Sequence, residues 1–200
     1  MPILYCFVIG YVIGIINPAF IIGKLKGFDI RTQGSGNAGG SNALITMGRW
    51  IGFACIIFDI LKTFAAIKLA EYLFPDFTSC LAVTVSGCVL GHIYPVTMHF
   101  RGGKGLACIA GGVLAYSVPL FFIALTVEAV IAIIINYICV IPITASIVFP
   151  IWYLIATGDV VGFSFMAVAA IVILSRHREN LARIKNGTEL HLSYLWNNQF

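Results

Sequence analysis

Three short polar stretches interrupt a chain that is otherwise strongly apolar. They read GSGNAGGSN at residues 34–42, GHIYPVTMHFRGGKG at 91–105 and SRHRENLARIKNGTE at 175–189. Their serine, asparagine, histidine, lysine and arginine side chains donate hydrogen bonds or carry positive charge, which is the chemistry that binds phosphate groups. They bring no paired carboxylates of the kind that hold a metal ion. The set therefore favours a phosphorylated substrate and predicts neither a metal nor another cofactor.

The first stretch combines repeated glycine with small polar residues. Glycine permits positive φ angles and a close approach of the backbone, and successive N–H groups in such a loop can form a concave anion site. The spacing fits neither the dinucleotide-binding nor the Walker A pattern, so a flexible polar linker is the alternative. The candidate substrate ligands are Ser35, Gly36, Asn37, Gly39, Ser41 and Asn42, with Arg49 following the stretch.

The second stretch ends in RGGKG, directly before an apolar segment that is expected to be helical. Unpaired N–H groups at a helix N-terminus attract anions, and the neighbouring lysine and arginine add full charges. The alternative is a positively charged membrane anchor with a glycine turn. The candidate ligands are Arg101, Gly102, Gly103, Lys104 and Gly105, whereas His92 is more consistent with a hydrogen-bonded packing residue.

The third stretch places His177 and Asn180 at i and i+3, so a helix would present both side chains on one face. Three arginines surround them. The ordinary pKa of histidine lies near neutral pH, which suits a general base. Taken alone, the stretch could be an ordinary basic helix at the membrane surface. Together with the other two stretches it predicts a site whose catalytic residues are His177, Ser35 and Asn180.

The composition shows the setting of these stretches. Of the 200 residues, 60% are hydrophobic and only 10% are charged, and the mean hydropathy is +0.99, whereas a soluble domain carries about 25% charged residues. The sequence therefore predicts an all-α integral membrane protein with a single polytopic domain over residues 1–200. The first apolar run lacks the positive flank of a secretory signal and is kept as a span. The six cysteines form no CxxC pair and are expected to pack in the core.

Several apolar runs approach the roughly 20 residues that cross a bilayer. They lie at about 2–23, 50–73, 78–98 and 160–175. The stretch 105–157 is too long for one crossing, and helix breakers fall near Tyr116–Pro119 and Asn136–Pro142. Short basic loops stay in the cytoplasm, and the basic residues group around the three polar stretches. An even number of crossings must then separate the second stretch from the third, which requires three helices in 105–157.

The predicted total is about seven transmembrane helices, with the N-terminus outside and the C-terminus in the cytoplasm. Cytoplasmic active-site loops are expected at about 24–49, 99–105 and 176–200. The segment after Ser175 is amphipathic and ends in Tyr194, Trp196 and Phe200. We therefore expect it to lie along the headgroup layer.

A few charged residues fall inside the apolar runs, where charge is costly. Asp59 and Lys62 have the i, i+3 spacing of an ion pair, and we favour a structural pair that supports the site over a catalytic role. Lys68 and Glu71 can reach the outer surface. Glu128 stands alone, and the sequence does not explain it.

The three stretches, in this order and spacing, resemble the three signature blocks of the PlsY family, bacterial acyl-phosphate:glycerol-3-phosphate acyltransferases. With the membrane pattern, the resemblance runs along the whole chain. Mild departures are Ser41 where threonine is usual, Arg101 where lysine is common, and Thr63 where glycine often follows Asp-x-x-Lys. The resemblance implies acyl transfer from acyl phosphate to the 1-hydroxyl of sn-glycerol 3-phosphate, giving lysophosphatidic acid and phosphate, the first committed step of phospholipid synthesis.

The resemblance also implies a seven-span, multi-pass protein of the bacterial cell (inner) membrane, with the active site facing the cytoplasm. The expected partners are glycerol 3-phosphate, acyl phosphate, membrane lipid and an upstream enzyme that forms the acyl phosphate, but no nucleic acid. Acyl-CoA is not expected as the donor. The other class of glycerolipid acyltransferases uses an H-x-x-x-x-D pattern, and none of the four histidines has aspartate five positions on.

The expected mechanism is direct acyl transfer, because phosphate is already a good leaving group and the enzyme must mainly bring two anions together and stabilise the oxyanion. The RGGKG stretch would hold one phosphate through its cations and the Gly103 and Gly105 amides. Arg49, Ser35 and the amides of the first stretch would hold the other.

In this mechanism His177 is the general base for the glycerol hydroxyl, which Asn180 and Ser35 would orient. Two variants stay open. A phosphate oxygen of the substrate could take the proton, because surrounding cations lower the pKa of His177. Alternatively, Ser35 could form a covalent acyl-enzyme.

Two other classes of membrane protein use comparable segments. A phosphate or organophosphate transporter needs glycine-interrupted polar segments, but the polar stretches here fall on one face rather than at the midplane, and few ionisable residues lie inside the spans. A membrane phosphotransferase that uses CDP-alcohols needs several acidic metal ligands on one helix, which this sequence lacks.

Overall fold

The computed structural model describes residues 1–189 and 191–193, and the regular structure in this part is helical. In chain order the elements are α1 (Pro2–Gly14), α2 (Pro18–Leu25), η1 (Ile30–Thr32), α3 (Gly40–Met47), α4 (Arg49–Leu73), α5 (Cys80–Ile93), η2 (Val96–Met98), α6 (Leu106–Tyr116), α7 (Val118–Ile135), α8 (Val140–Thr157), α9 (Val160–Arg176) and α10 (Arg178–Lys185). The predicted aromatic membrane-surface residues Tyr194, Trp196 and Phe200 lie outside the described residues.

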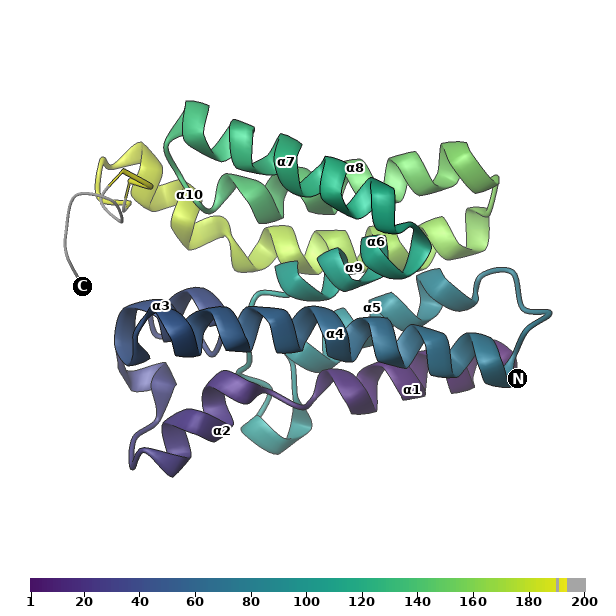
Figure 1. The fold of residues 1–200 in the computed structure, drawn as a ribbon, viewed down its shortest axis with the longest axis horizontal. Coiled ribbons are helices and arrows are strands. Elements are labelled where there is room, and N and C mark those ends of the chain that lie inside the picture. The colour runs from purple at the N-terminus through teal and green to yellow at the C-terminus, as the bar shows by residue number, and fades with distance from the viewer. Residues whose placement is uncertain (190, 194–200) are drawn as a thin grey trace.

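The long helices lie side by side in a bundle, with the N-terminus at one end and α2, α3 and α10 at the other (Figure 1). We call the second end the polar end, and it comprises residues 24–49, 94–105 and 176–189. Ten of the twelve lysines and arginines belong to these segments, and the other two are Lys62 and Lys68. The three polar stretches are therefore gathered at one end of the bundle.

Within the described residues, five helical segments are long and apolar enough to cross a membrane, namely Pro2–Leu25, Arg49–Leu73, Cys80–Met98, Val118–Ile135 and Val140–Thr157. A sixth is α9 with α10, if their 43° bend is allowed within one span. Helix α6 has only 11 residues, which is about 16 Å at about 1.5 Å per residue. The fold is thus that of a helical membrane protein, while a total of seven spans stays a prediction.

Most predicted boundaries agree with the structure. The spans expected at 50–73 and 160–175 are α4 and α9, and the stretch 105–157 divides into α6, α7 and α8 at the expected breaks. The predicted spans 2–23 and 78–98 correspond to the apolar segments Pro2–Leu25 and Cys80–Met98, but neither is one continuous α-helix. The span 2–23 is broken between Gly14 and Pro18, because Asn17 caps a new helix whose first residue is a proline. The span 78–98 is α-helical only to Ile93, shortly before Pro95.

Small residues let α1 and α5 pack closely at the centre of the bundle. A side chain at Gly10 or Gly14 would strike the α5 backbone, and one at Gly87 or Gly91 would strike the α1 backbone. Both helices therefore carry a G-x-x-x-G pattern on the shared face, as closely packed membrane helices do. Helix α5 is largely buried and lies at the centre of the bundle. The second polar stretch continues from its C-terminal end.

The charged residues within the apolar helices have partners. Lys62 Nζ lies 2.6 Å from Asp59 Oδ1, with both side chains 3% exposed, which confirms the predicted ion pair. Lys68 and Glu71 form an exposed pair at 2.8 Å. Glu128 on α7 accepts a hydrogen bond of 2.5 Å from the Thr144 hydroxyl on α8, a contact that sequence reasoning missed.

Candidate active site

Asn42 organises the first polar stretch. Its Nδ2 group lies 2.9–3.0 Å from the carbonyl oxygens of Ile30, Gln33 and Asn37, and its Oδ1 atom accepts a hydrogen bond of 2.8 Å from the Ser35 N–H group. The residue is only 1% exposed. Because its amide is fully engaged with the loop backbone, Asn42 shapes the loop rather than offering a free donor to a ligand.

The same loop leaves other polar groups open. Gly34 and Gly36 have φ angles of 54° and 71°, a region that favours glycine. Gly39 is the N-cap of α3, so the first N–H groups of that helix have no intrahelical acceptor and can bind an anion. Asn37 Oδ1 is buried and lacks a hydrogen-bond partner within the described residues. The Ser35 and Ser41 side chains are at exposed positions.

Two residues outside the predicted site fix this loop to its surroundings. Asn17, which is 2% exposed, caps α2 and donates a hydrogen bond of 2.8 Å to the Ala38 carbonyl. Arg31 makes a bidentate contact with Asp29 and donates to the Met98 carbonyl at 2.8 Å. The hydrogen bond from Arg31 holds the pKa of the Asp29 carboxyl well below its usual range. The Asn-Pro pair at 17–18 was the sequence signal for the first of these contacts.

The glycines of RGGKG serve packing. The Gly102 and Gly103 N–H groups donate to the carbonyls of Ile93 and His92 at 3.0 and 2.9 Å. A side chain at Gly103 would strike the His92 ring and lie 2.9 Å from the Ala38 carbonyl oxygen. The Gly103 amide is therefore already paired, which corrects its expected role as a phosphate donor. Gly105 has a φ angle of 88° and is the N-cap of α6, so the open amides of this stretch lie there.

His177 occupies the bend between α9 and α10. Its Nδ1 atom lies 2.8 Å from the Ile173 carbonyl oxygen, and the residue is 3% exposed. A carbonyl only accepts hydrogen bonds, so Nδ1 carries the hydrogen, and in the neutral ring Nε2 keeps its lone pair. Burial lowers the pKa of His177, and the nearby Lys104 and Arg176 charges lower it further. The geometry thus favours a neutral imidazole with Nε2 as the basic atom.

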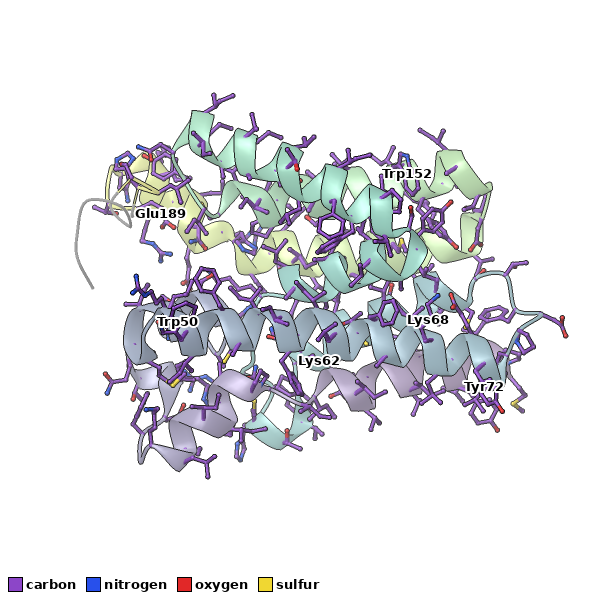
Figure 2. The ribbon with its side chains drawn as sticks, viewed as in Figure 1. Trp50, Lys62, Lys68, Tyr72, Trp152 and Glu189 are labelled. Carbon is purple, nitrogen blue, oxygen red and sulfur yellow. The ribbon has the colours of Figure 1, made fainter. Side chains whose placement is uncertain are left out.

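A chain of polar side chains connects the second and third stretches. Lys104 Nζ donates to Asn180 Oδ1, Asn180 Nδ2 donates to Glu189 Oε1, and Arg183 Nε donates to Glu189 Oε2, each at 2.6 Å. Burial lowers the pKa of the Lys104 ammonium group, and the Arg183 charge adds to this effect. Glu189, labelled in Figure 2, lies at the polar end. Because Glu189 accepts from the Asn180 amide nitrogen, it turns the amide oxygen towards Lys104.

The predicted site residues are only partly brought together. The second and third stretches meet through Lys104 and Asn180, and the first is tied to the second through Arg31 and through Ala38 beside Gly103. Ser35, Gly36, Ser41, Arg49 and Arg101 are exposed at the polar end. The guanidinium carbon of Arg49 lies 5.5 Å from the centre of the Trp50 ring. His177 and Asn180 share one helical turn, whereas the hydrogen bond of Ser35 goes to Asn42, so the three predicted catalytic residues form no hydrogen-bonded triad.

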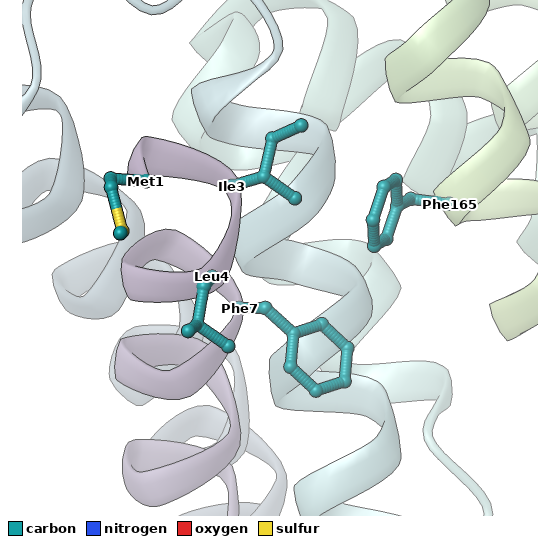
Figure 3. Close-up of a pocket in the computed structure, with 5 residues that line it drawn as sticks. All are labelled: Met1, Ile3, Leu4, Phe7 and Phe165. Atoms are coloured by element: carbon teal, nitrogen blue, oxygen red, sulfur yellow. The ribbon is translucent and has the colours of Figure 1, made fainter.

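An apolar pocket lies at the opposite end of the bundle, beside the N-terminus. It is lined by Met1, Ile3, Leu4, Phe7 and Phe165 (Figure 3). These side chains suit a hydrocarbon chain and offer nothing to a phosphate group. Among the described residues, no three histidine, cysteine, aspartate or glutamate side chains converge as metal ligands. The polar end therefore holds the chemistry-bearing groups described above.

The fold and the polar end define a helical membrane protein in which cationic side chains, two helix N-termini and a buried histidine lie at one end of the bundle. The family model for glycerol-3-phosphate acyltransferase matches residues 4–187. A glycerol-3-phosphate acyltransferase of Thermoanaerobacter sp. (strain X514) is 34% identical over 186 residues, which cover 92% of this chain and 93% of the relative. Glycerol-3-phosphate acyltransferase 3 of Bacillus anthracis is 36% identical over 184 residues, covering 92% and 91%.

The fold is also similar to solved structures. The crystal structure of PlsY, an integral membrane glycerol 3-phosphate acyltransferase, in its glycerol 3-phosphate form gives a TM-score of 0.85 at 33% identity, covering 94% of each chain. Its lysophosphatidic acid form gives a TM-score of 0.82 at the same identity and coverage. The chain belongs to the glycerol-3-phosphate acyltransferase family, as the three polar stretches predict.

Proposed function

We propose that this acyltransferase moves the acyl group of an acyl phosphate to the 1-hydroxyl group of sn-glycerol 3-phosphate and releases lysophosphatidic acid and inorganic phosphate. Acylation of glycerol 3-phosphate, the first committed step of phospholipid synthesis, follows from membership of the family. The observation that carries the proposal for this chain is the meeting of three distant polar stretches at one end of the bundle, with Lys104 bonded to Asn180 one helical turn from His177.

The site offers two places for phosphate groups. Lys104 and Arg101, with the N-terminus of α6 beginning after Gly105, form the first. Ser35 and the N-terminus of α3 form the second, and Arg49 follows the C-terminal end of that helix. Helix N-termini and cations both favour phosphate. Since phosphate is a good leaving group, holding two anionic substrates in contact supplies much of the catalysis.

His177 is the proposed base for the glycerol hydroxyl. Its fixed tautomer leaves Nε2 as proton acceptor, and its lowered pKa keeps the ring neutral at physiological pH. Asn180 acts in this scheme by anchoring Lys104, and the unpaired Oδ1 atom of Asn37 suits a hydroxyl donor. A phosphate oxygen of the substrate is the competing base. In the part of the chain that the structure describes, the Ser35 hydroxyl has no hydrogen-bonded base that would activate it as a nucleophile.

The membrane topology forms part of the proposal. We place the polar end at the cytoplasmic face of the bacterial cell membrane, with seven spans in one domain and the N-terminus outside. The concentration of ten lysines and arginines at that end supports this orientation. There the site can receive glycerol 3-phosphate from the cytoplasm and acyl phosphate from the leaflet, the latter supplied by an upstream enzyme.

The test is to incubate the purified protein in lipid nanodiscs with glycerol 3-phosphate and either acyl phosphate or acyl-CoA, in the presence of EDTA. We expect equal amounts of lysophosphatidic acid and phosphate from acyl phosphate, and no product from acyl-CoA. Product from acyl-CoA alone would contradict the proposed donor. Flux of glycerol 3-phosphate into sealed vesicles without acylation would favour a transporter.

Topology is tested separately by cysteine substitution at exposed positions. Gln33→Cys and Glu179→Cys at the polar end should be shielded from an impermeant maleimide in right-side-out vesicles, whereas Asp76→Cys should react. The native cysteines are buried and provide a low background. Labelling of Gln33→Cys and Glu179→Cys from opposite sides would end the proposal of a shared cytoplasmic site.

A further inference from the structure

Asp59, Lys62 and His92 form a buried ionic cluster in the middle of the bundle, away from the groups assigned to substrate. Lys62 lies midway along α4, between Trp50 and Tyr72 (Figure 2). Lys62 Nζ is 2.6 Å from Asp59 Oδ1 and 3.2 Å from His92 Nδ1, and His92 Nδ1 is 3.5 Å from the same carboxylate oxygen. The three side chains are 3–4% exposed.

The cluster reaches the first polar stretch through the break between α1 and α2. Lys62 Nζ donates to the carbonyls of Gly14 and Ile16, at 3.1 and 2.6 Å. These carbonyls lie where the helix ends and would otherwise lack hydrogen-bond donors. The next residue, Asn17, starts α2 and donates to the Ala38 carbonyl at 2.8 Å. The position of Lys62 is thus coupled to the GSGNAGGSN loop through one short segment of backbone.

The cluster reaches the second polar stretch through His92. The His92 carbonyl accepts the Gly103 N–H group at 2.9 Å, and its ring fills the space that a side chain at Gly103 would need. A side chain at Gly103 would also press on the Ala38 carbonyl. Both routes from the cluster therefore end where the two loops touch, between Ala38 and Gly103.

A buried ion pair is a poor source of stability, because desolvation offsets the attraction between the charges. Such a pair is better suited to fixing one arrangement of the backbone, since each group demands a specific partner. We infer that the Asp59–Lys62–His92 cluster is a positioning element. It fixes the two phosphate-binding loops, 34–42 and 94–105, relative to each other, acting through Ile16–Asn17 on one side and Gly103 on the other. This inference rests on the proposed function for the role of the loops.

The central experiment distinguishes the effect of the cluster on the order of the two loops from the cost of burying an unpaired charge. Lys62→Met leaves the buried Asp59 without its lysine partner and should lower both the melting temperature and the order of the loops. The double variant Asp59→Asn/Lys62→Met removes the unpaired charge, so its melting temperature should recover. Its two loops should still exchange amide hydrogens faster than in the wild type, because the Gly14 and Ile16 carbonyls stay without their donor. Hydrogen exchange of peptides covering 34–42 and 94–105 provides this readout without any assay of activity.

Kinetics provide the second readout. Misplacement of a group by about 1 Å can cost about 100-fold in rate, so kcat/KM of the double variant should fall by about 10- to 100-fold, with KM for glycerol 3-phosphate raised. His92→Asn keeps an acceptor near Nδ1 and should retain more activity than His92→Leu. The matched control is Lys68→Met/Glu71→Gln, an exposed i, i+3 pair on the same helix. A buried control is Thr84→Val on α5, whose hydroxyl bonds only within its helix. Both controls should behave as wild type.

Faster loop exchange in the double variant, with wild-type exchange in both controls, supports the inference. Wild-type exchange in both loops of the double variant overturns it, whatever the activity. If the wild-type protein transfers no acyl group, the proposed function fails, and the exchange comparison still decides whether the cluster orders the loops.

Discussion

The hydrogen bonds of Asn180 hold the Lys104 ammonium group in place, so their loss should lower activity. Asn180 accepts from Lys104 and donates to Glu189, both at 2.6 Å, and it is 6% exposed. A hydrogen bond to a charged group contributes about 1.5–3 kcal/mol. Asn180→Leu removes both bonds while keeping a similar volume, so Lys104 loses its anchor and Glu189 loses one of its donors.

The expected effect on activity follows from the bond to Lys104. If positioning of the ammonium group contributes the same about 1.5–3 kcal/mol to the transition state, kcat/KM falls by about 10- to 150-fold. Initial rates of phosphate release, measured in nanodiscs over a range of both substrates, would give this ratio. The fall should be concentrated in KM for the substrate whose phosphate Lys104 holds, which also assigns the two phosphate places.

The control for Asn180→Leu is Asn186→Leu, an exposed position at the end of the same helix. It should keep wild-type kinetics. Melting temperatures of both variants separate a local effect from unfolding. A change of less than about threefold in kcat/KM for a folded Asn180→Leu protein corresponds to under about 0.7 kcal/mol. Such a result would refute the view that Asn180 anchors a phosphate-binding lysine.

Three further outcomes are expected. His177→Ala should lower kcat by about 10²–10⁴-fold. Because burial lowers the pKa of His177, the wild-type rate should rise with pH below about 6.5 and then level off. A variant that loses only tenfold in kcat and keeps this pH dependence would assign the base to a substrate phosphate. Gly103→Ala should lower kcat/KM and the melting temperature, because the methyl group strikes the His92 ring, whereas Gly158→Ala, in open space at the other end, should leave activity intact. Asn42→Ala should destabilise the first loop and speed its hydrogen exchange, since four hydrogen bonds to the backbone are lost. Wild-type exchange in this variant would show that the loop keeps its structure without these bonds.

The sequence predicts the helices well where the apolar run and its flanking breakers coincide. Helices α4 and α9 lie within one residue of their predicted spans, and the breaks between α6, α7 and α8 fall where proline and polar residues stand. The break after Gly14 was missed because long apolar segments flank the Asn-Pro pair at 17–18 on both sides and make a single span of the whole run. It is stabilised by Lys62, which is 46–48 residues away in the chain. Periodicity and composition contain no information about such a contact.

The site was predicted in its residue types and location but not in the roles of its members. Glycine in RGGKG was expected to offer amides to phosphate, yet Gly102 and Gly103 are small because another segment packs against them. Asn42 was expected to be a ligand, and its amide instead holds the loop. Glu189 was missed as a site residue, because its link to the site runs through the Asn180 amide on α10, which also bonds Lys104 of the second stretch. A local sequence pattern predicts which groups are polar, but only the fold determines which of them remain free.

This division between committed and free groups indicates where the substrates bind. A buried polar group without a partner is costly, and the cost grows where water is scarce, so the fold satisfies most such groups internally. The open groups are then those that a ligand must satisfy. Among the predicted site residues they are the Ser35 and Ser41 hydroxyls, the Arg49 and Arg101 guanidinium groups, Asn37 Oδ1 and His177 Nε2. Four of these six donate to or attract anions, and the other two are acceptors suited to a hydroxyl proton. A phosphorylated alcohol complements both kinds of group, because it carries hydroxyl donors at a distance from its phosphate, whereas a single phosphate ion held by the cations has no such separate hydroxyl for Asn37 Oδ1. Glycerol 3-phosphate should therefore protect the first loop from hydrogen exchange more strongly than inorganic phosphate does, and equal protection by the two ligands would contradict this assignment of the hydroxyl acceptors.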